Sequence, residues 1–469
     1  MKLDRSRCVS ALPLLAAALA VAALVFWWSR QGEGAASERL PGADQPPGAD
    51  AAAAVNPVLA GKLIQGQAQP ANLPGLWPQF RGPNRDDISP DTAPLARSWD
   101  AAGPRLLWAV DCGEGYAGAV VREGRVYLLD YDYGKKENAL RCLSLADGRE
   151  IWRFAYAMQV KRNHGMTRTV PAVADKYVVA LDPKCHVLCL DSATGELRWG
   201  LNLVHEYGTT IPPWYAGQCP LIDGQAVILA PGGRDALLAA VELATGKLLW
   251  RSPNPHEWKM THSSVMPMEF AGKRFYVYCG SGGVAGISAK DGTLLWETSE
   301  WKISIATVPS PLVLDGGRIL LSGGYNAGSL LLRLREQDGR LVPETVWKLG
   351  PEVFGATQHT PIFHDGLIYG TRPNGQFVCL GLDGKVLRAS PKGEDFGLGP
   401  FLLADGFFFV MNDAGKLSLL EDSPARFNLS AQAQVLQGRE SWGPMALAGG
   451  RLLARDFTRL VCLDVSQAK

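Results

Sequence analysis

The feature that most constrains this chain is a short hairpin motif that returns every 45 to 51 residues. Its fullest copy is ATGKLLW at residues 244–250. In each copy an Asp-Gly or Thr-Gly turn follows one apolar run and begins a second run, which often ends in Trp. Glycine at such a turn accepts the positive φ that a tight hairpin needs. Further copies occur at residues 146–152, 193–199, 290–296, 337–339 and 382–388. A period of this length predicts a repeat architecture.

Each repeat contains four short strand-like segments and no helical pattern between them. A proline precedes the first segment of the unit at seven places: Pro171, Pro220, Pro267, Pro311, Pro361, Pro400 and Pro444. Four short strands per unit are typical of a β-propeller blade. We therefore expect an all-β fold built from four-stranded antiparallel blades.

The number of blades follows from the two ends of the repeat region. The seven prolines begin blades two to eight, and residues 116–121 begin blade one. The last blade ends near Asp464 without a fourth strand, whereas residues 103–108 match the spacing of a fourth strand. Closing the ring with that N-terminal strand leaves no open edge. We predict eight blades over residues 104–469, with seven as the alternative.

The charge balance excludes one class of partner. The chain has a formal net charge of +1, with 20% charged residues and no clustered Lys or Arg. Nucleic-acid binding leaves a basic patch or stripe in a sequence. We expect no nucleic-acid partner.

The N-terminus has the pattern of a membrane anchor. Lys2, Arg5 and Arg7 precede an uncharged run of twenty residues, 9–28, which is long enough to span a bilayer as a helix. The positive flank favours an inside N-terminus. We predict a signal anchor over residues 1–30 that places the propeller in the periplasm as a single-pass inner-membrane protein. The alternative is a cleaved signal with small residues at 34–36 and a secreted product.

Residues 31–76 are rich in Ala, Gly, Pro and Gln and show no periodic apolar face. Such a composition predicts a flexible tether. It ends at WPQFRGPNRD, residues 77–86, which open a lead-in segment over residues 77–103.

This lead-in and the hairpin repeats closely resemble bacterial pyrroloquinoline-quinone-like (PQQ-like) β-propeller repeat proteins. The ring also resembles the propeller of the outer-membrane assembly lipoprotein of the BamB type. The resemblance covers roughly residues 77–465. It implies an eight-bladed ring in the WD40/quinoprotein-like superfamily that is secreted or faces the periplasm and often holds other proteins.

The cysteines read as small core side chains. Cys142, Cys189, Cys379 and Cys462 share one repeat position, and Ala240 and Gly286 take that position in two other blades. Cys185 and Cys189 lie four residues apart, about 13 Å along a regular strand, which is too far for a disulfide. We expect neither a disulfide there nor a metal site.

Quinoprotein dehydrogenases, to which the resemblance extends, stack a quinone between a Trp and a disulfide of adjacent cysteines, beside a calcium ion. This chain contains no Cys-Cys pair. We therefore predict no cofactor and favour a binding protein over an enzyme. A PQQ- and calcium-dependent oxidoreductase is kept as an alternative.

Polar and aromatic residues gather before the innermost strands, where they would line one mouth of the central channel. Groups of this kind converging from several blades make a candidate ligand site. The alternative is that the mouth is polar only because water fills it. The nine candidates are Glu114, Tyr116, His164, Arg168, Trp214, His262, Gln358, His359 and Trp442.

Together these observations favour a membrane-tethered, extracytoplasmic scaffold that binds other proteins, among them components of envelope assembly. We expect a monomer. Two alternatives stand beside it: the oxidoreductase, and a small-molecule or glycan receptor that uses the channel mouth.

Overall fold

The computed structural model describes residues 18–25, 56–423 and 426–467. The chain divides into two compact units, Met1–Asp44 and Gln45–Lys469. In the first unit the described part is a helix over residues 18–25. Within the three described ranges, no helix is long and apolar enough to cross a bilayer. Most of the apolar run at 9–28 lies outside them, so the anchor and the cleaved signal both stay predictions.

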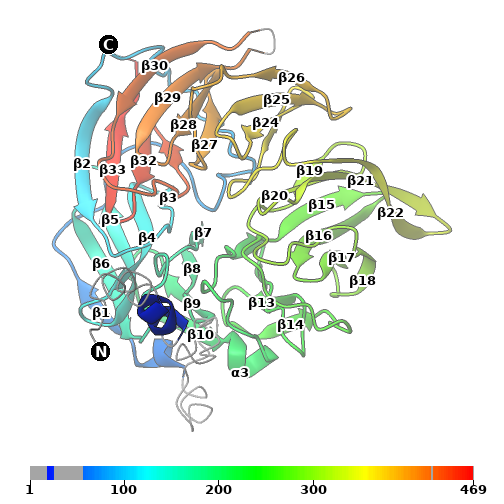
Figure 1. The fold of residues 1–469 in the computed structure, drawn as a ribbon. Coiled ribbons are helices and arrows are strands. Elements are labelled where there is room, and N and C mark those ends of the chain that lie inside the picture. The colour runs from blue at the N-terminus through cyan, green and yellow to red at the C-terminus, as the bar shows by residue number, and fades with distance from the viewer. Residues whose placement is uncertain (1–17, 26–55, 424–425, 468–469) are drawn as a thin grey trace, which may run out of the picture. The chain divides into compact units, whose positions relative to one another are not determined.

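The second unit is a ring of eight antiparallel sheets, shown in Figure 1. Seven sheets have four strands, and the sheet of blade one has a fifth. The innermost strand of blade one contacts the innermost strands of both blade two and blade eight, so the ring is closed. The prediction of an all-β, eight-bladed propeller is confirmed.

The strands of blades one to four, from the centre outward, begin and end as follows. Blade one has β3 (Val120–Arg122), β4 (Arg125–Asp132), β5 (Glu137–Ser144), β6 (Glu150–Ala157) and the added β1 (Lys62–Gln65). Blade two has β7 (Ala172–Ala174), β8 (Tyr177–Leu181), β9 (His186–Asp191) and β10 (Leu197–Asn202). Blade three has β11 (Leu221–Asp223), β12 (Ala226–Leu229), β13 (Ala239–Glu242) and β14 (Leu248–Arg251). Blade four has β15 (Met266–Phe270), β16 (Lys273–Gly280), β17 (Gly283–Ser288) and β18 (Leu294–Thr298).

The remaining blades follow the same order. Blade five has β19 (Leu312–Leu314), β20 (Arg318–Gly323), β21 (Gly328–Gln337) and β22 (Arg340–Leu349). Blade six has β23 (Ile362–His364), β24 (Leu367–Thr371), β25 (Phe377–Gly381) and β26 (Val386–Ala389). Blade seven has β27 (Phe401–Ala404), β28 (Phe407–Met411), β29 (Lys416–Glu421) and β30 (Leu429–Gln434). Blade eight has β31 (Ala446–Ala448), β32 (Arg451–Arg455), β33 (Arg459–Asp464) and β2 (Arg105–Asp111). Two short helices, η1 (Pro57–Ala60) and α3 (Leu203–Tyr207), lie outside the sheets.

Blade eight is completed by β2, the strand from the other end of the chain. It pairs antiparallel with β33, with Leu106 opposite Leu463 and Ala109 opposite Val461. In Figure 1 the two strands lie side by side at the left of the ring, cyan beside red. The predicted closure is therefore confirmed.

A repeated contact between tryptophan and glycine joins neighbouring blades. The Trp of one outer strand packs against the turn glycine of the next blade, and its indole N–H donates to a carbonyl there at 2.8–3.2 Å. The pairs are Trp108 with Gly148, Trp152 with Gly195, Trp199 with Gly246, Trp250 with Gly292, and Trp347 with Gly384. The Trp in the repeat thus fastens one blade to the next at five of the eight junctions.

Blade five breaks this pattern. Its β21–β22 hairpin has strands of ten residues each and carries the turn glycine Gly339 away from blade four, so that nothing lies within 4 Å of a Cβ built there. Trp296 of blade four instead lies over Gly286, its partner across the sheet, and its indole N–H is buried without a bond among the described residues. A side chain at Gly286 would collide with this ring.

A belt of side-chain acceptors runs round the ring just before the innermost strands. Val170 N–H donates to Cys219 Sγ (3.2 Å), Cys219 N–H to Ser264 Oγ (2.9 Å), Ser264 N–H to Ser310 Oγ (3.0 Å), and Ser310 N–H to Thr360 Oγ1 (2.8 Å). Each bond joins one blade to the next, from blade two to blade six. Buried backbone donors need such partners, so this belt fixes the spacing of the segments that surround the centre.

The lead-in segment crosses the centre of the ring. Between residues 77 and 89 it makes hydrogen bonds to blades one, two, four, six and seven, through Val121, Val173, Val265, Pro361 and Leu403. Blades two and six lie on opposite sides of an eight-membered ring, so the segment spans the middle. The sequence predicts only a lead-in segment here, so its position across the ring is known from the structure alone.

Part of the expected tether is ordered on the propeller. Residues 31–55 lie outside the described ranges, but β1 pairs with the outer strand β6 of blade one, with Leu63 opposite Phe154. Val58 of η1 is buried and packs beside Gly200. The Ala, Gly, Pro and Gln content of residues 56–76 hid this strand, because an edge strand with one exposed face needs few strongly apolar residues. The predicted flexible tether therefore does not extend to residue 76, because η1 and β1 are held against the propeller.

The cysteines in the described ranges are all free, and seven of the eight are buried. Cys142, Cys189 and Cys462 each lie opposite a Trp in the neighbouring strand. A small side chain leaves room for the indole ring at that register position. The expectation that these cysteines act as small core residues is confirmed.

Candidate functional site

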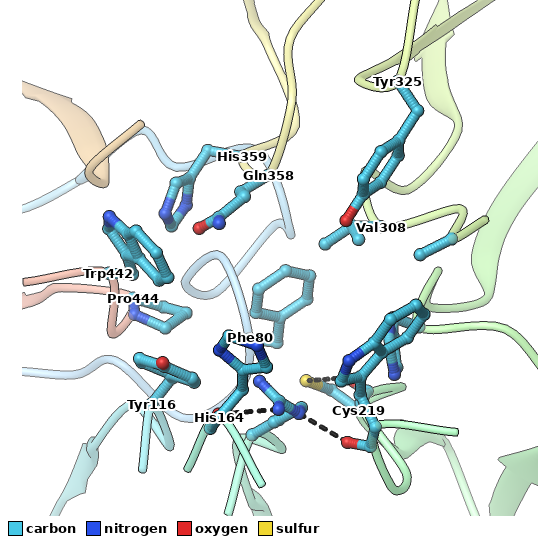
Figure 2. A pocket seen from close by; sticks show the side chains of 15 residues that line it. Phe80, Tyr116, His164, Cys219, Val308, Tyr325, Gln358, His359, Trp442 and Pro444 are labelled. Carbon is cyan, nitrogen blue, oxygen red and sulfur yellow. Dashed lines mark hydrogen bonds between the residues drawn. The ribbon is translucent and has the colours of Figure 1, made fainter. Parts of the chain in front are cut away.

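A cavity of about 320 Å³ opens at the centre of the ring. Its walls come from segments that precede the innermost strands of most blades, and Figure 2 shows their side chains pointing toward a common space. Of the nine residues that the sequence analysis proposed, eight line this cavity; Glu114 does not. The repeat explains the convergence, because the same position in each blade faces the ring axis.

Glu114 lies at the rim instead. Its carboxylate pairs with Arg162 through two contacts, one of them 2.7 Å from Arg162 Nε. The sequence predicts Glu114 at the mouth because it, like Tyr116, precedes the innermost strand of blade one. Alternate residues of an extended segment share a face, but the backbone bonds of Gly115 to Phe457 and of Tyr116 to Thr167 turn the chain here.

Tyr116 forms one aromatic wall. Its ring lies 5.4 Å from the Trp442 ring and 5.5 Å from the Phe457 ring between centroids. Its hydroxyl donates to Glu440 Oε2 at 2.6 Å. Burial, and then this hydrogen bond to a carboxylate, raise the pKa of Tyr116 well above its ordinary value. Tyr116 is therefore a neutral, fixed aromatic surface.

Arg168 is the charged group of the wall. Its guanidinium lies 5.1 Å from the Tyr116 ring centroid and donates to three backbone carbonyls, those of Trp214 (2.6 Å), His164 (2.7 Å) and Gly165 (3.3 Å). None of these acceptors carries charge, and no described carboxylate lies within ion-pair distance. Burial lowers the pKa of Arg168 to about 10. Its carbonyl bonds hold the guanidinium in place without neutralising it.

Two histidines in the wall are neutral at pH 7. His262 Nε2 donates to the Tyr215 carbonyl at 2.9 Å, and His359 Nε2 is buried without a hydrogen-bond partner among the described residues. Burial lowers the pKa of each imidazole to about 4. They therefore add hydrogen-bonding atoms to the cavity, and no positive charge.

The lead-in supplies the floor. Phe80 lines the cavity, and the Arg85 guanidinium lies 5.9 Å from its ring centroid. Arg85 is 2% exposed and bonds only neutral oxygens, those of Gln79 (3.3 Å) and Val265 (3.2 Å). Burial lowers its pKa to about 10. Because the lead-in spans the centre, the cavity is a blind pocket, open on one face only.

Sequence reasoning missed some of the lining. Phe80 was quoted within WPQFRGPNRD as a family signature, but no periodicity marks a segment that crosses a ring. Tyr325 comes from the β20–β21 loop, whose Gly-Gly-Tyr-Asn sequence at residues 323–326 is typical of a turn. Its φ of 55° is unusual for a non-glycine residue, and that strain cannot be read from the letters.

The cavity lining does not fit a calcium ion. Calcium takes six to eight oxygen ligands, mainly carboxylates, and none of the residues lining the cavity is Asp or Glu. Across the described ranges, no cluster of three or more His, Cys, Asp or Glu side chains is placed to hold a metal. We therefore derive no chemistry through a quinone and calcium at this site.

The fold and site define a class: an eight-bladed propeller with a blind, aromatic-walled pocket at its centre. The family model described as "Outer membrane protein assembly factor BamB" matches residues 135–390, which is more than half of the chain. The chain therefore belongs to this family of PQQ-like β-propellers.

Solved structures agree on the fold. A europium-containing methanol dehydrogenase has a TM-score of 0.58 at 14% identity, covering 84% of this chain and 90% of that one. BamB from Moraxella catarrhalis has a TM-score of 0.53 at 13% identity, covering 77% and 100%. The computationally designed Ika8 protein has a TM-score of 0.52 at 12% identity, covering 77% and 100%. No curated protein sequence matches the chain. At these identities the likeness concerns the fold alone.

Proposed function

We propose that this protein is a membrane-tethered, extracytoplasmic scaffold that holds another protein, with a role in envelope assembly. In this proposal the apolar run at residues 9–28 anchors the chain in the inner membrane and the propeller works in the periplasm. Membership of the BamB family supports the scaffold role.

The observation that carries the proposal is a blind pocket with an exposed apolar rim. Tyr325 lines the cavity and is 49% exposed, and Ile305, which precedes the lining residue Ala306, is 52% exposed. Five of the fifteen lining residues are Phe, Tyr or Trp. Protein interfaces place aromatic side chains at such central anchor points. A pocket closed by the lead-in cannot pass a chain through, so a partner would insert an end or a side chain.

The test is site-specific photocrosslinking in the native membrane. A photoreactive residue in place of Tyr325 is expected to give one discrete adduct with a second protein. The same residue at Leu387, which is 54% exposed on the outer strand β26, is the matched control. Adducts at both positions alike, or at neither, would contradict the proposal.

A second candidate is a small-molecule or glycan receptor. The cavity volume of about 320 Å³ falls within the range of ligand pockets. Native mass spectrometry of the purified protein distinguishes the two. A small molecule that co-purifies, and is lost in Trp442→Ala while the melting temperature holds, would favour the receptor. The oxidoreductase alternative gains no support from the cavity lining, which offers no carboxylate ligands for calcium.

A further inference from the structure

We propose that the central pocket recognises the C-terminal end of a peptide: a carboxylate next to an amide N–H, with an apolar or aromatic terminal side chain. This inference rests on the proposed function, because it names the part of the partner that enters the pocket. Its basis is the charge, the free hydrogen-bonding atoms and the shape of the cavity.

The first step is the charge of Arg168. Arg168 is only partly exposed, and a guanidinium withdrawn from water is costly without a counter-ion. Among the described residues, its acceptors are neutral backbone carbonyls. These bonds use Nε and Nη2 and leave Nη1 without a partner among the described residues. The Glu440 carboxylate acts on Arg168 electrostatically, but it accepts from the Tyr116 hydroxyl and makes no ion pair with Arg168. A ligand carboxylate would supply the missing charge.

The second step is the charge of the floor. Arg85, beneath Phe80, bonds only neutral oxygens. The neighbouring Arg81 pairs with Asp87 at 2.6 Å, so the floor holds two guanidinium groups and one paired carboxylate. With no acidic residue in the lining, the pocket favours an anion over a neutral or cationic ligand.

The third step is an unsatisfied ring nitrogen. His359 lines the cavity, and its Nε2 is buried without a hydrogen-bond partner among the described residues. In the neutral tautomer with the proton on Nδ1, Nε2 is an acceptor. A ligand that brings an N–H beside its carboxylate then satisfies both His359 and Arg168. The last residue of a peptide has that pair of groups.

The fourth step is shape. An α-helix with its side chains is about 10–12 Å across, so a blind cavity of about 320 Å³ admits a chain end and excludes a helix. The Tyr116, Trp214 and Trp442 rings offer flat apolar surfaces for the terminal side chain. An aromatic terminal residue would use them best.

The experiment compares two probes that differ only in charge. N-acetyl-phenylalanine and its C-terminal amide are titrated into the full-length detergent-solubilised protein, and binding is followed by ligand-observed NMR. We expect the acid to bind at least about tenfold more tightly, since charge-assisted hydrogen bonds are the stronger kind. Equal binding of acid and amide, or tighter binding of the amide, would overturn the inference without any need for a variant.

Variants then locate the effect. Arg168→Gln should abolish the preference for the acid, Arg168→Lys should keep part of it, and Arg234→Gln, at an exposed arginine with 76% of its side chain in solvent, should change nothing. A preference that persists in Arg168→Gln would contradict the assignment. A tetrapeptide that ends in Phe with a free carboxylate should bind at least as well as the single residue. If only the single residue binds, the pocket takes small acids and the peptide assignment fails.

The failure of this inference can be told apart from the failure of the scaffold role. If the adduct at position 325 forms but N-acetyl-phenylalanine does not compete with it, the scaffold stands and the carboxylate inference fails. If no adduct forms while the acid binds selectively, the scaffold proposal fails and the pocket acts as a receptor for small acids.

Discussion

At the scale of single side chains, the pocket histidines give the folded protein a pH dependence. Burial lowers the pKa of His262 from 6.5 to about 4. The unfolded chain therefore binds the proton first as the pH falls. The stability linked to this group is complete above pH 6.5 and is lost toward pH 4.

We predict that His262→Gln, which keeps a donor for the Tyr215 carbonyl, flattens the fall in stability between pH 6.5 and 4.5. The effect should reach about 2 kcal/mol over that interval. Urea unfolding at several pH values measures it, with the exposed His205→Gln as the control that leaves the slope unchanged. Asp87 has the opposite effect on stability, and it has this effect in the parent protein and in the variant alike. Its pKa is raised to about 6, so the folded state gains stability from Asp87 as the pH falls. An unchanged slope in His262→Gln would contradict the account.

The turn glycines offer a second comparison at this scale. Gly246 and Gly339 occupy the same repeat position with φ of 71° and 76°. A Cβ at Gly246 would lie 2.7 Å from the Trp199 ring, whereas nothing lies within 4 Å at Gly339. Gly339→Ala should cost about 1–2 kcal/mol for the left-handed backbone alone.

Gly246→Ala should lower stability by the same amount for the left-handed backbone, and by about 1–3 kcal/mol more for displacing the Trp199 indole. Denaturant unfolding of the two variants against the parent protein gives the difference. Equal losses would show that the contact between Trp and glycine does not stabilise the ring.

At the scale of elements, the belt before the innermost strands is the main new feature. Thr360 accepts the Ser310 N–H at 2.8 Å in a buried position. Thr360→Val keeps the shape and removes the acceptor, so it should cost about 1–3 kcal/mol for an unsatisfied buried donor. Thr360→Ser keeps the hydroxyl and should cost less. Thermal unfolding ranks the two variants, and the reverse order would argue against the belt.

Other elements differ in how far the sequence predicted them. The closing strand β2 was predictable because the last repeat lacked its fourth strand and residues 103–108 had the matching spacing. The long β21–β22 hairpin was not predictable. The turn at Gly339 keeps the repeat interval, so the sequence does not show that this glycine lies away from the Trp of the preceding blade. Strand β1 and the crossing of the lead-in depend on contacts with distant blades, which no local pattern records. The lining of the pocket was largely predictable for one reason: equivalent positions in a closed ring face one axis.

At the scale of the whole molecule, closure depends on one strand. Trp108 of β2 is 7% exposed, donates to the Leu145 carbonyl at 3.0 Å and packs on Gly148, so it ties blade eight to blade one. We predict that Trp108→Ala costs about 3–5 kcal/mol. Leu106→Ala in the same strand, at a side chain that is 50% exposed, should change stability by less than about 0.5 kcal/mol. Similar losses in the two variants, measured by urea unfolding, would contradict this role.

Ring closure and the crossing lead-in together explain why the centre is a pocket. Eight blades bring the wall residues together, and residues 77–89 close one side. Arg168 lines this pocket and Arg85 lies beneath its floor, and neither has an ion-pair partner among the described residues. The same ring architecture occurs in proteins of different kinds, so the fold alone does not determine what this pocket binds.

The most direct test of the account is the identity of the peptide that crosslinks to position 325 in the membrane. Mass spectrometry of the adduct should return one recurrent partner segment, which ends in a free carboxylate close to the crosslinked residue. Peptides from many unrelated proteins, or the same set that position 387 captures, would contradict the claim that the centre of this ring holds a specific partner.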